Sequence, residues 1–480
     1  MTVSGSAPSS SVSIAAPIDF KIPGRVHLVG IGGTGMQALA EYLSDAGWTV
    51  SGSDDTSIPS SLEARGLRLF KGHRADAIPP ATELVIHSAA VIASNPELLR
   101  AVERNIPILG YAQALGMLTQ QSRAICIAGT HGKSTTAAMT AHLLQRGNLH
   151  PSAIVGAESI GRNCSGWRGA SELLVLESCE YRRHFLGLSP THTVVTGIEE
   201  DHFDCYPDRN AALEAFGEFV ALVPAEGSLA IPADNLEVWS LVKRTNASIV
   251  TFGINSSAEW NACRLRNLGT GIRFELHHRE RTLGEVQLRV PGRHNVMNAL
   301  AAIAVSESLG LDDRLLTTGL ESFRGIRRRF EILARNEKFV LIDDYAHHPT
   351  AVREILATAR EMFPGRRIRC LFQPHQISRT ERLLQEFGES LTGADESWIG
   401  PVFTARESNA DAAIDWSKRL AESCRLAGGT AQSFDTLDRM VSTLEDKARS
   451  GDVILTVGAG NINRIHHDLI GRLFRNSESG

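Results

Sequence analysis

The chain has 480 residues, of which 42% are hydrophobic and 21% charged, and its formal net charge is −5. This composition is typical of a soluble globular α/β protein and excludes a disordered or fibrous chain. The weakly acidic balance provides no broad basic field for phosphate backbones, so we expect no nucleic acid partner.

The length predicts more than one hydrophobic core, because domains usually hold about 100 to 200 residues. We expect a loose tail over residues 1–22 and three domains over 23–120, 121–325 and 326–480. No stretch approaches the roughly 18 uninterrupted apolar residues of a membrane-spanning helix, so no membrane insertion is expected. Seven scattered cysteines without a CxxC pair indicate reduced thiols in a cytoplasmic protein and argue against a zinc ribbon.

The first domain begins with a buried strand over 26–29, a glycine-rich turn over 30–35 and a helix over 36–45. Further strands are expected over 48–51 and 84–87, and Pro96 marks the start of another helix. This alternation predicts a parallel sheet. Gly30, Gly32 and Gly35 have the GxGxxG spacing, and Asp54 lies about where a ribose-binding acid would sit. The pattern suits NAD, another dinucleotide or a nucleotide-sugar pyrophosphate.

The second domain opens with a strand over 124–128, followed by the segment Gly129-Thr130-His131-Gly132-Lys133-Ser134-Thr135 and a helix over 136–145. Backbone amides of such a loop surround phosphate oxygens, while Lys133 reaches the transferred phosphate and a hydroxyl of Ser134 or Thr135 serves Mg²⁺. More strands are expected over 173–177, 193–196 and 228–231, with a helix over 295–308. The domain is therefore predicted to bind a nucleotide through a P-loop.

The third domain restarts the alternation, with strands over 339–342, 368–372 and 453–457 and a helix over 349–363. Three histidine pairs, at 277/278, 347/348 and 466/467, lack metal-type spacing to Cys or Glu and are read as surface or helix residues. The predicted class is α/β, with Rossmann-like first and third domains around the P-loop ATPase domain.

Taken together, the motifs resemble the Mur ligases of peptidoglycan synthesis, in cell wall biogenesis. The resemblance covers roughly residues 25 to 463 and rests on Gly30–Met36, Ser51–Asp54, Gly129–Thr135, Gly292–Asn295 with Asn298-Ala299, Arg328–Phe330, Asp343–Thr350, Phe372–His375 with Ser378–Thr380, and Gly458–Gly460. The segment Phe372–His375 in particular resembles the member that joins L-alanine to UDP-N-acetylmuramate. The family often has Asn where this chain has Gly197.

The resemblance implies an ATP-dependent carboxylate-amine ligase that forms this amide through an acyl phosphate, with Mg²⁺, or Mn²⁺ in its place. Its implied UDP-sugar contacts are Gly30, Gly32, Gly33, Thr34, Gly35, Asp54, His73 and Ser88. The implied ATP contacts are Gly129 to Thr135, Asn295, Asn298, Arg329 and Asp344, and the implied metal ligands are Ser134, Thr135, Glu180 and His202. The amino-acid pocket is implied at Tyr345, His347, Arg379 and Ala459, and the implied catalytic residues are Lys133, Glu180, His202, Arg329 and His347.

Three alternatives stay open at this point. The chain could be a Mur-type ligase with a different amino-acid or peptide acceptor, an oxidoreductase using the Gly30 loop for NAD(P), or a non-catalytic nucleotide-binding relative. The oxidoreductase offers no role for Lys133. The sequence leaves the oligomeric state open.

Overall fold

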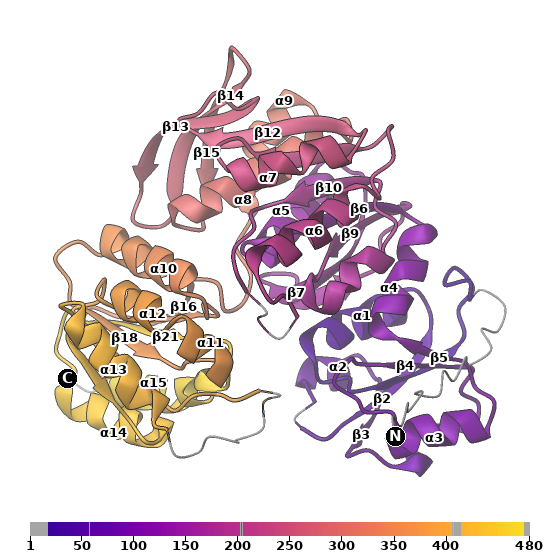
Figure 1. Ribbon diagram of the computed structural model, residues 1–480, viewed down its shortest axis with the longest axis horizontal. Coiled ribbons are helices and arrows are strands. Elements are labelled where there is room, and N and C mark those ends of the chain that lie inside the picture. The colour runs from indigo at the N-terminus through magenta and orange to yellow at the C-terminus, as the bar shows by residue number, and fades with distance from the viewer. Residues whose placement is uncertain are drawn as a thin grey trace, which may run out of the picture. The chain divides into compact units, whose positions relative to one another are not determined.

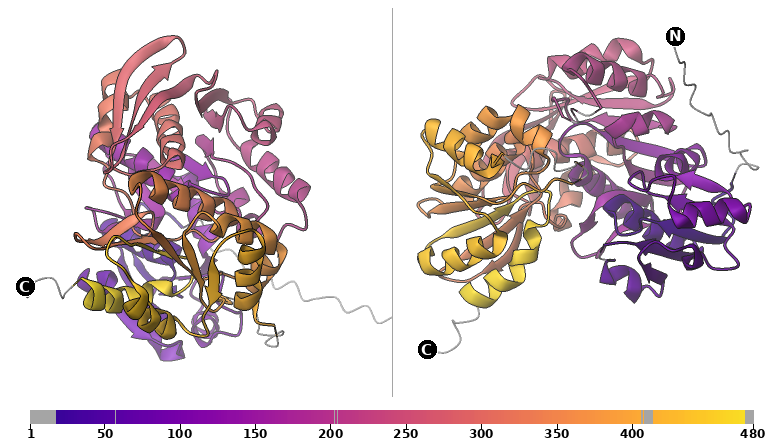
Figure 2. Two further views of the ribbon diagram at one scale, coloured as in Figure 1. Left: turned by 90° about the vertical axis from the view of Figure 1, so that its left-hand side faces the viewer. Right: turned by 60° about the horizontal axis from the view of Figure 1, so that its bottom comes forward.

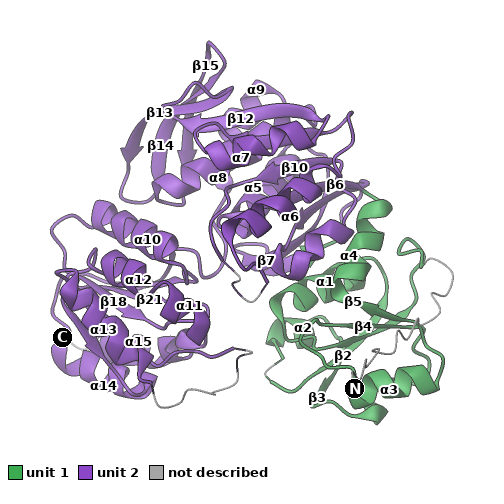
Figure 3. Cartoon of the chain, viewed as in Figure 1, with its two compact units in different colours: residues 1–122, 166–168 green, residues 123–165, 169–480 purple. Residues whose placement is uncertain are grey.

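The computed structural model describes residues 18–56, 58–201, 203, 205–405, 407 and 414–474. The chain forms two compact units, one of residues 1–122 with 166–168 and one of residues 123–165 with 169–480 (Figure 3). Among the described residues, no helix combines the length and apolar character needed to cross a membrane. The predicted α/β class is confirmed, while the boundaries predicted for the three domains stay a prediction.

Unit 1 is built on a five-stranded parallel sheet in the order β3-β2-β1-β4-β5 (Figure 1). The order reverses where β1 lies between β2 and β4, and ligands of such sheets bind at the carboxyl ends of the strands beside that point. The elements are β1 (Arg25–Val29), α1 (Thr34–Asp45), β2 (Thr49–Asp54), α2 (Ser60–Ala64), β3 (Arg68–Lys71), η1 (Ala75–Ala77), β4 (Leu84–His87), α3 (Pro96–Glu103), β5 (Ile108–Gly110) and α4 (Tyr111–Gln120).

Residues 18–22 are the described end of the expected loose tail, and Phe20 anchors them to the rest of unit 1. Phe20 is 3% exposed and its ring lies 5.7 Å from that of Trp48. The amide of Phe20 also donates to Gln121 Oε1 at 3.0 Å. Burial of an aromatic side chain therefore extends the folded part of the chain into the segment expected to be loose.

The first part of unit 2 is a ten-stranded mixed sheet in the order β15-β14-β13-β12-β11-β10-β6-β9-β7-β8. Its strands are β6 (Arg123–Ala128), β7 (Ser152–Ser159), β8 (Cys164–Trp167), β9 (Leu173–Glu177), β10 (His192–Val195), β11 (Ser228–Pro232), β12 (Ser248–Ile254), β13 (Trp260–Asn267), β14 (Ile272–His278) and β15 (Arg281–Leu288). Its helices are α5 (Lys133–Arg146), η2 (Tyr181–Gly187), α6 (Arg209–Val220), α7 (Leu236–Ser240), η3 (Val242–Arg244), α8 (Arg293–Glu307), α9 (Asp313–Thr318) and η4 (Gly319–Ser322).

Several features of this part differ from the sequence expectation, among them the start of α5 and an antiparallel extension of the sheet. Helix α5 begins at Lys133, three residues earlier than predicted, because the left-handed Gly132 (φ 80°) turns the chain directly into the helix. The antiparallel strands β13, β14 and β15 were not predicted. Their polar residues alternate with buried ones, and β14 buries Ile272, Phe274 and Leu276 on one face only.

The second part of unit 2 is a six-stranded sheet in the order β16-β17-β21-β18-β19-β20, parallel except for β16. Helices cover both faces (Figure 1; Figure 2). Helices α10, α12 and α13 share one apolar cluster with the sheet, while α14 and α15 share the other. The elements are β16 (Glu331–Arg335), β17 (Val340–Asp344), α10 (Pro349–Met362), β18 (Ile368–Phe372), α11 (Ile377–Arg382), α12 (Leu384–Leu391), β19 (Glu396–Ile399), α13 (Trp416–Leu426), β20 (Ala431–Ser433), α14 (Leu437–Lys447), β21 (Val453–Val457), η5 (Ile462–Ile465) and α15 (His466–Leu473).

A buried carboxylate connects the start of α3 to the sheet of unit 1. Glu97 is fully buried and accepts hydrogen bonds from His27 Nε2 (2.6 Å), Ser53 Oγ (2.7 Å) and His73 Nδ1 (2.8 Å). Burial alone would raise the pKa of Glu97, but the hydrogen bonds from His27, Ser53 and His73 lower it below its usual range. The ionised form is therefore held in place by neighbouring donors.

Replacing this carboxylate should destabilise unit 1. We expect Glu97→Ala to lower the free energy of unfolding by about 3 kcal/mol, because it leaves buried donors unpaired. Urea denaturation measures the change. Glu103→Ala is the matched control on the same helix, since the Glu103 side chain is 64% exposed, and should change stability by less than about 0.5 kcal/mol. Equal effects of the two substitutions would contradict the assigned role.

Candidate functional site

The segment between β6 and α5 is shaped by two glycines. A Cβ atom on Gly129 (φ 129°) would lie 2.1 Å from Thr196 Oγ1, and one on Gly132 (φ 80°) would lie 2.3 Å from Asn298 Oδ1. Side chains are thus excluded at both positions by close neighbours and by backbone conformation. The amide of Thr130 donates to the carbonyl of Gly197 at 2.9 Å, which fixes the loop against the end of β10.

The amine of Lys133 lies at the start of α5 and faces the carboxylate of Glu180. The Nζ–Oε1 distance is 2.8 Å, and the Glu180 side chain is 5% exposed. Burial would lower the pKa of Lys133, but the nearby Glu180 carboxylate outweighs it and the pKa is raised. The site therefore holds a permanent positive charge at the start of a helix, where phosphate oxygens are also favoured.

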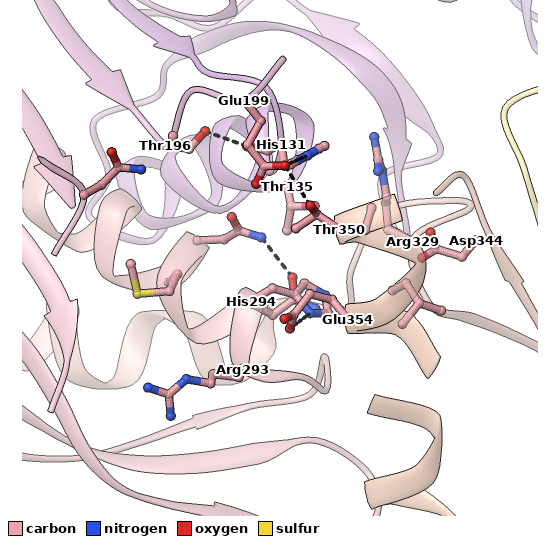
Figure 4. Close-up of a pocket in the computed structure, with 18 of the residues that line it drawn as sticks. His131, Thr135, Thr196, Glu199, Arg293, His294, Arg329, Asp344, Thr350 and Glu354 are labelled. Carbon is pink, nitrogen blue, oxygen red and sulfur yellow. Dashed lines mark hydrogen bonds and ion pairs between the residues drawn. The ribbon is translucent and has the colours of Figure 1, made fainter. Parts of the chain in front are cut away.

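A cavity of about 360 Å³ opens beside this loop in unit 2 (Figure 4). Polar groups from the loop, from the segment after β10, from α8 and from the start of α10 face it. The lining residues are His131, Gly132, Thr135, Thr196, Gly197, Ile198, Glu199, Asn235, Phe252, Arg293, His294, Asn295, Met297, Asn298, Arg329, Asp344, Thr350, Ala351, Glu354 and Ile355. Its size and mixed lining are typical of a small-molecule site.

The cavity brings together many of the predicted nucleotide contacts. Asn295 and Asn298 lie on α8 and are joined by a hydrogen bond from Asn298 Nδ2 to Asn295 Oδ1 at 3.1 Å. Thr135 lines the cavity, whereas Ser134, buried on the same helix turn, is not among the lining residues. This bond fixes the orientation of the two amide groups relative to each other.

The end of β17 contributes Asp344, and the preceding arginine cluster contributes Arg329. The Asp344 carboxylate accepts from the amides of Phe330 and Ala346, each at 2.7 Å, and burial raises its pKa to about 6 in spite of Arg329. The guanidinium of Arg329 lies 5.4 Å from the ring centre of Tyr345. Both predicted ATP contacts therefore line the cavity from the C-terminal part of the chain.

A cluster that the sequence did not predict adjoins the phosphate loop. Glu199 Oε2 lies 3.4 Å from His131 Nε2 and 3.5 Å from His348 Nδ1, and it accepts a hydrogen bond from Thr350 Oγ1 at 2.7 Å. The side chains of His131, Glu199 and His348 could together hold a metal ion. His348 belongs to a histidine pair that is visible in the sequence, but no local pattern indicates that residues about 150 positions apart meet.

The predicted amino-acid contacts form a second group outside the cavity lining. His347 Nδ1 lies 2.8 Å from the carbonyl of Tyr345, and its ring centre lies 5.8 Å from that of His375. Arg379 is 2% exposed, and its Nε donates to Asp201 Oδ1 at 3.0 Å. Burial lowers the pKa of His347 well below its usual range, so the ring is neutral at pH 7.

The remaining C-terminal contact, Ala459, follows β21. The amide of the neighbouring Gly458 donates to the carbonyl of Asp344 at 3.0 Å, so Ala459 lies at the same end of the sheet as the aspartate. The predicted metal ligand His202 lies outside the described residues.

In unit 1, the glycine-rich segment lies at the carboxyl ends of β1 and β4. A Cβ on Gly30 (φ 82°) would lie 2.9 Å from Ser88 Cβ, and one on Gly35 would lie 2.8 Å from the Tyr111 hydroxyl. Asp54 Oδ2 accepts from the Gly32 amide at 2.8 Å, so this carboxylate holds the turn. Gly33 and Thr34 begin α1, and the predicted contact His73 is held by Glu97.

Comparison with known proteins gives the family. Three family models match the chain. The model described as "Mur ligase family, catalytic domain" matches residues 25–123, and the "Mur ligase middle domain" matches residues 127–306. The "Mur ligase, glutamate ligase domain" matches residues 328–460. The chain belongs to the Mur ligase family. Among its relatives, the UDP-N-acetylmuramate–L-alanine ligase of Chlorobium phaeobacteroides is 38% identical over 449 residues, 92% of this chain and 96% of the relative.

Other Mur ligases are also similar to this chain over most of its length. The enzyme of the same name from Desulfitobacterium hafniense is 37% identical over 456 residues, 94% of this chain and 100% of the relative. The crystal structure of the UDP-N-acetylmuramate-alanine ligase from Thermotoga maritima has a TM-score of 0.79 at 28% identity and covers 94% of this chain and 99% of its own. A murein peptide ligase from Psychrobacter arcticus shares the fold, with a TM-score of 0.73 at 24% identity over 94% of this chain and 98% of its own.

Two glycines of this Mur ligase site should respond differently to substitution. Gly129→Ala should lower the free energy of unfolding by about 2 kcal/mol or more, because of its positive φ and the contact with Thr196. Gly197→Ala should change stability by less than about 0.5 kcal/mol, since its Cβ would meet only Asn235 Nδ2 at 3.9 Å. Denaturant midpoints of the two variants test this, and similar losses in both would refute it.

The Glu199 cluster should contribute stability that depends on pH. Burial would raise the pKa of Glu199, but hydrogen bonds and charges from His131, Thr350 and His348 lower it to about 2. Because its pKa is lowered on folding, the ionised Glu199 carboxylate stabilises the fold at pH values above the ordinary pKa of 4.5. That stabilisation is lost as the pH falls towards 2. Because the side chain is 37% exposed, solvent screening limits the effect to about 1 kcal/mol.

Unfolding of the wild type and Glu199→Gln in urea, at pH 6 and pH 3.5, measures this contribution. The wild type should be more stable than the variant at pH 6, and the difference should shrink at pH 3.5. A difference that does not change with pH would contradict the assignment.

Proposed function

We propose that this Mur ligase is an ATP-dependent ligase that joins the carboxylate of UDP-N-acetylmuramate to the amine of L-alanine, in peptidoglycan precursor synthesis. The observation that carries the proposal is the 37–38% identity, over nearly the full length, to enzymes of that name. Membership of a ligase family also accounts for Lys133, for which the NAD(P) oxidoreductase alternative has no role. ATP and nucleotide sugars occur inside the cell, so the proposal implies a cytoplasmic enzyme.

A carboxylate must be activated before an amine can displace its oxygen. In the proposed reaction, the muramoyl carboxylate oxygen attacks the γ-phosphorus of ATP and the bond to ADP breaks, which gives an acyl phosphate. The neutral amine of L-alanine then attacks the acyl carbon, the bond to phosphate breaks, and the nitrogen gives up one proton to water as the amide forms. Lys133 and Arg329 offset the negative charge that spreads over the phosphoryl oxygens.

Lys133 is suited to this role because its raised pKa keeps the amine protonated and because Glu180 lies close to it. The Nζ–Oε1 contact with Glu180 holds the amine beside the loop Gly129–Thr135. We assign ATP to the cavity, with its phosphates on Gly129–Thr135, adenine near Asn295 and Asn298, and ribose near Asp344. The UDP-sugar is assigned to the Gly30–Gly35 loop, with Asp54 holding the turn and His73 and Ser88 beside it.

The residues beside the phosphate loop fit a magnesium ion. Glu180 supplies a buried carboxylate, and Ser134 and Thr135 supply hydroxyls on the first turn of α5, which are the oxygen donors that Mg²⁺ prefers. Bound Mg²⁺, or Mn²⁺ in its place, would neutralise charge on the ATP phosphates. His202 remains the proposed ligand of a second ion.

We assign the amino-acid pocket to Tyr345, His347, Arg379 and Ala459. Nδ1–H of the neutral His347 donates a hydrogen bond to the Tyr345 carbonyl, so Nε2 of His347 is left to accept one. This favours a role for His347 in positioning the alanine amine. Arg379 would bind the alanine carboxylate while retaining Asp201 as its partner. This requires the two carboxylates to share one guanidinium, which has five donors.

Phosphate release tests the proposal directly. Wild-type protein with ATP, Mg²⁺, UDP-N-acetylmuramate and single acceptors should release phosphate with L-alanine, and comparison with serine, glycine and a tripeptide identifies the acceptor. Lys133→Ala should lower the rate by about 100-fold or more. Lys418→Ala is the matched control, because the Lys418 side chain is 68% exposed, and should keep the wild-type rate. Release that does not depend on an acceptor, or equal rates in both variants, would refute the proposal.

A further inference from the structure

Three metal-binding side chains meet on the ladder between β13 and β14. Cys263 pairs directly with Glu275 across the ladder, and His277 lies two residues further along β14, opposite Asn261. Residues two apart on a strand share a face, so the three side chains emerge on the same side. This is the face opposite the buried Phe274 and Leu276, and none of the three residues lines the cavity described above.

The donor atoms are close enough to share one ion. Cys263 Sγ lies 3.2 Å from His277 Nε2 and 3.8 Å from Glu275 Oε1, and the latter two atoms are 2.7 Å apart. Zinc bonds of about 2.0 to 2.3 Å at tetrahedral angles separate donor atoms by about 3.3 to 3.6 Å. The distances from Sγ to Nε2 and from Sγ to Oε1 are within a few tenths of an ångström of that range. The Nε2–Oε1 distance needs to widen by about half an ångström.

Neighbouring groups orient the donors. Thr282 Oγ1 lies 3.3 Å from His277 Nδ1, which leaves Nε2 directed at the thiol. Arg264 Nη1 donates at 3.1 Å to Oε2 of Glu275, the oxygen that does not face the cysteine. Partners of this kind, on the far atom of each ligand, are characteristic of protein metal sites.

The strands are also irregular at this point. The β13–β14 register shifts between Cys263 and Arg266, and the β14–β15 register shifts between Leu276 and His277. Bulges redirect side chains and are frequent beside functional sites. Here they flank two of the three donors.

We propose that Cys263, Glu275 and His277 form a binding site for a divalent transition metal of the Zn²⁺ class. A thiolate and an imidazole favour such ions over Mg²⁺, which prefers oxygen donors. The Glu275 and His277 side chains are 20% and 22% exposed, so the fourth position is open to water. Binding exchanges the thiol proton for the metal and releases that proton to solvent.

Cobalt serves as the probe, because a thiolate bound to Co²⁺ gives a charge-transfer absorption band that imidazole and carboxylate ligands alone do not. When full-length protein is titrated with Co²⁺, the absorbance of this band should rise until one equivalent of Co²⁺ per chain has been added. Added Zn²⁺ should abolish the band. Cys263→Ser should remove the band, and His277→Gln should weaken cobalt binding about tenfold or more. His278→Gln is the matched control, since this neighbour points to the other face and should leave the titration unchanged.

Two results would overturn the proposal. One is Co²⁺ binding without a thiolate band, which would place the ion at the thiol-free cluster of His131, Glu199 and His348 or elsewhere. The other is a band that persists in Cys263→Ser, which would assign it to another cysteine. Alanine-dependent phosphate release should persist in Cys263→Ser, because Cys263 has no part in the proposed reaction, and this verifies folding independently.

Discussion

The ion pair of Lys133 and Glu180 is the interaction on which the site depends. A partly buried ammonium and a buried carboxylate are each costly alone, and at 2.8 Å each compensates part of the desolvation of the other. The pair joins the start of α5, which follows β6, to the segment after β9. The strands β6 and β9 are neighbours in the ten-stranded sheet. It therefore fixes a positive charge beside the loop amides, and glycine at 129 and 132 lets the backbone approach this closely.

The acidic run 199–201 connects the two sheets of unit 2. Glu199 accepts a hydrogen bond from Thr350, the carbonyl of Glu200 lies 3.2 Å from His348 Nε2, and Asp201 pairs with Arg379. Each partner comes from the C-terminal sheet or its helices. Glu199 of this segment thus lines the cavity, and Asp201 holds Arg379 of the proposed amino-acid pocket.

The strand–loop–helix units could be predicted from the sequence because their signals are local. Glycine at 30, 129 and 132 is required by backbone geometry, buried strands appear as short apolar runs, and Lys133 follows its loop directly. Helix α5 nevertheless begins earlier than expected, and the antiparallel β13–β15 extension was missed, since half-exposed strands rich in charged residues give a weak apolar signal.

What the sequence determined by itself is the α/β alternation, the two glycine-rich loops and the Mur ligase motifs, all of which depend on neighbours within a few residues. Tertiary structure alone decided which distant side chains meet: Glu199 with His348, Arg379 with Asp201, and Cys263 with Glu275 and His277. The reason is physical. Such contacts depend on strand register and on the packing of sheets, and these are set by the whole core.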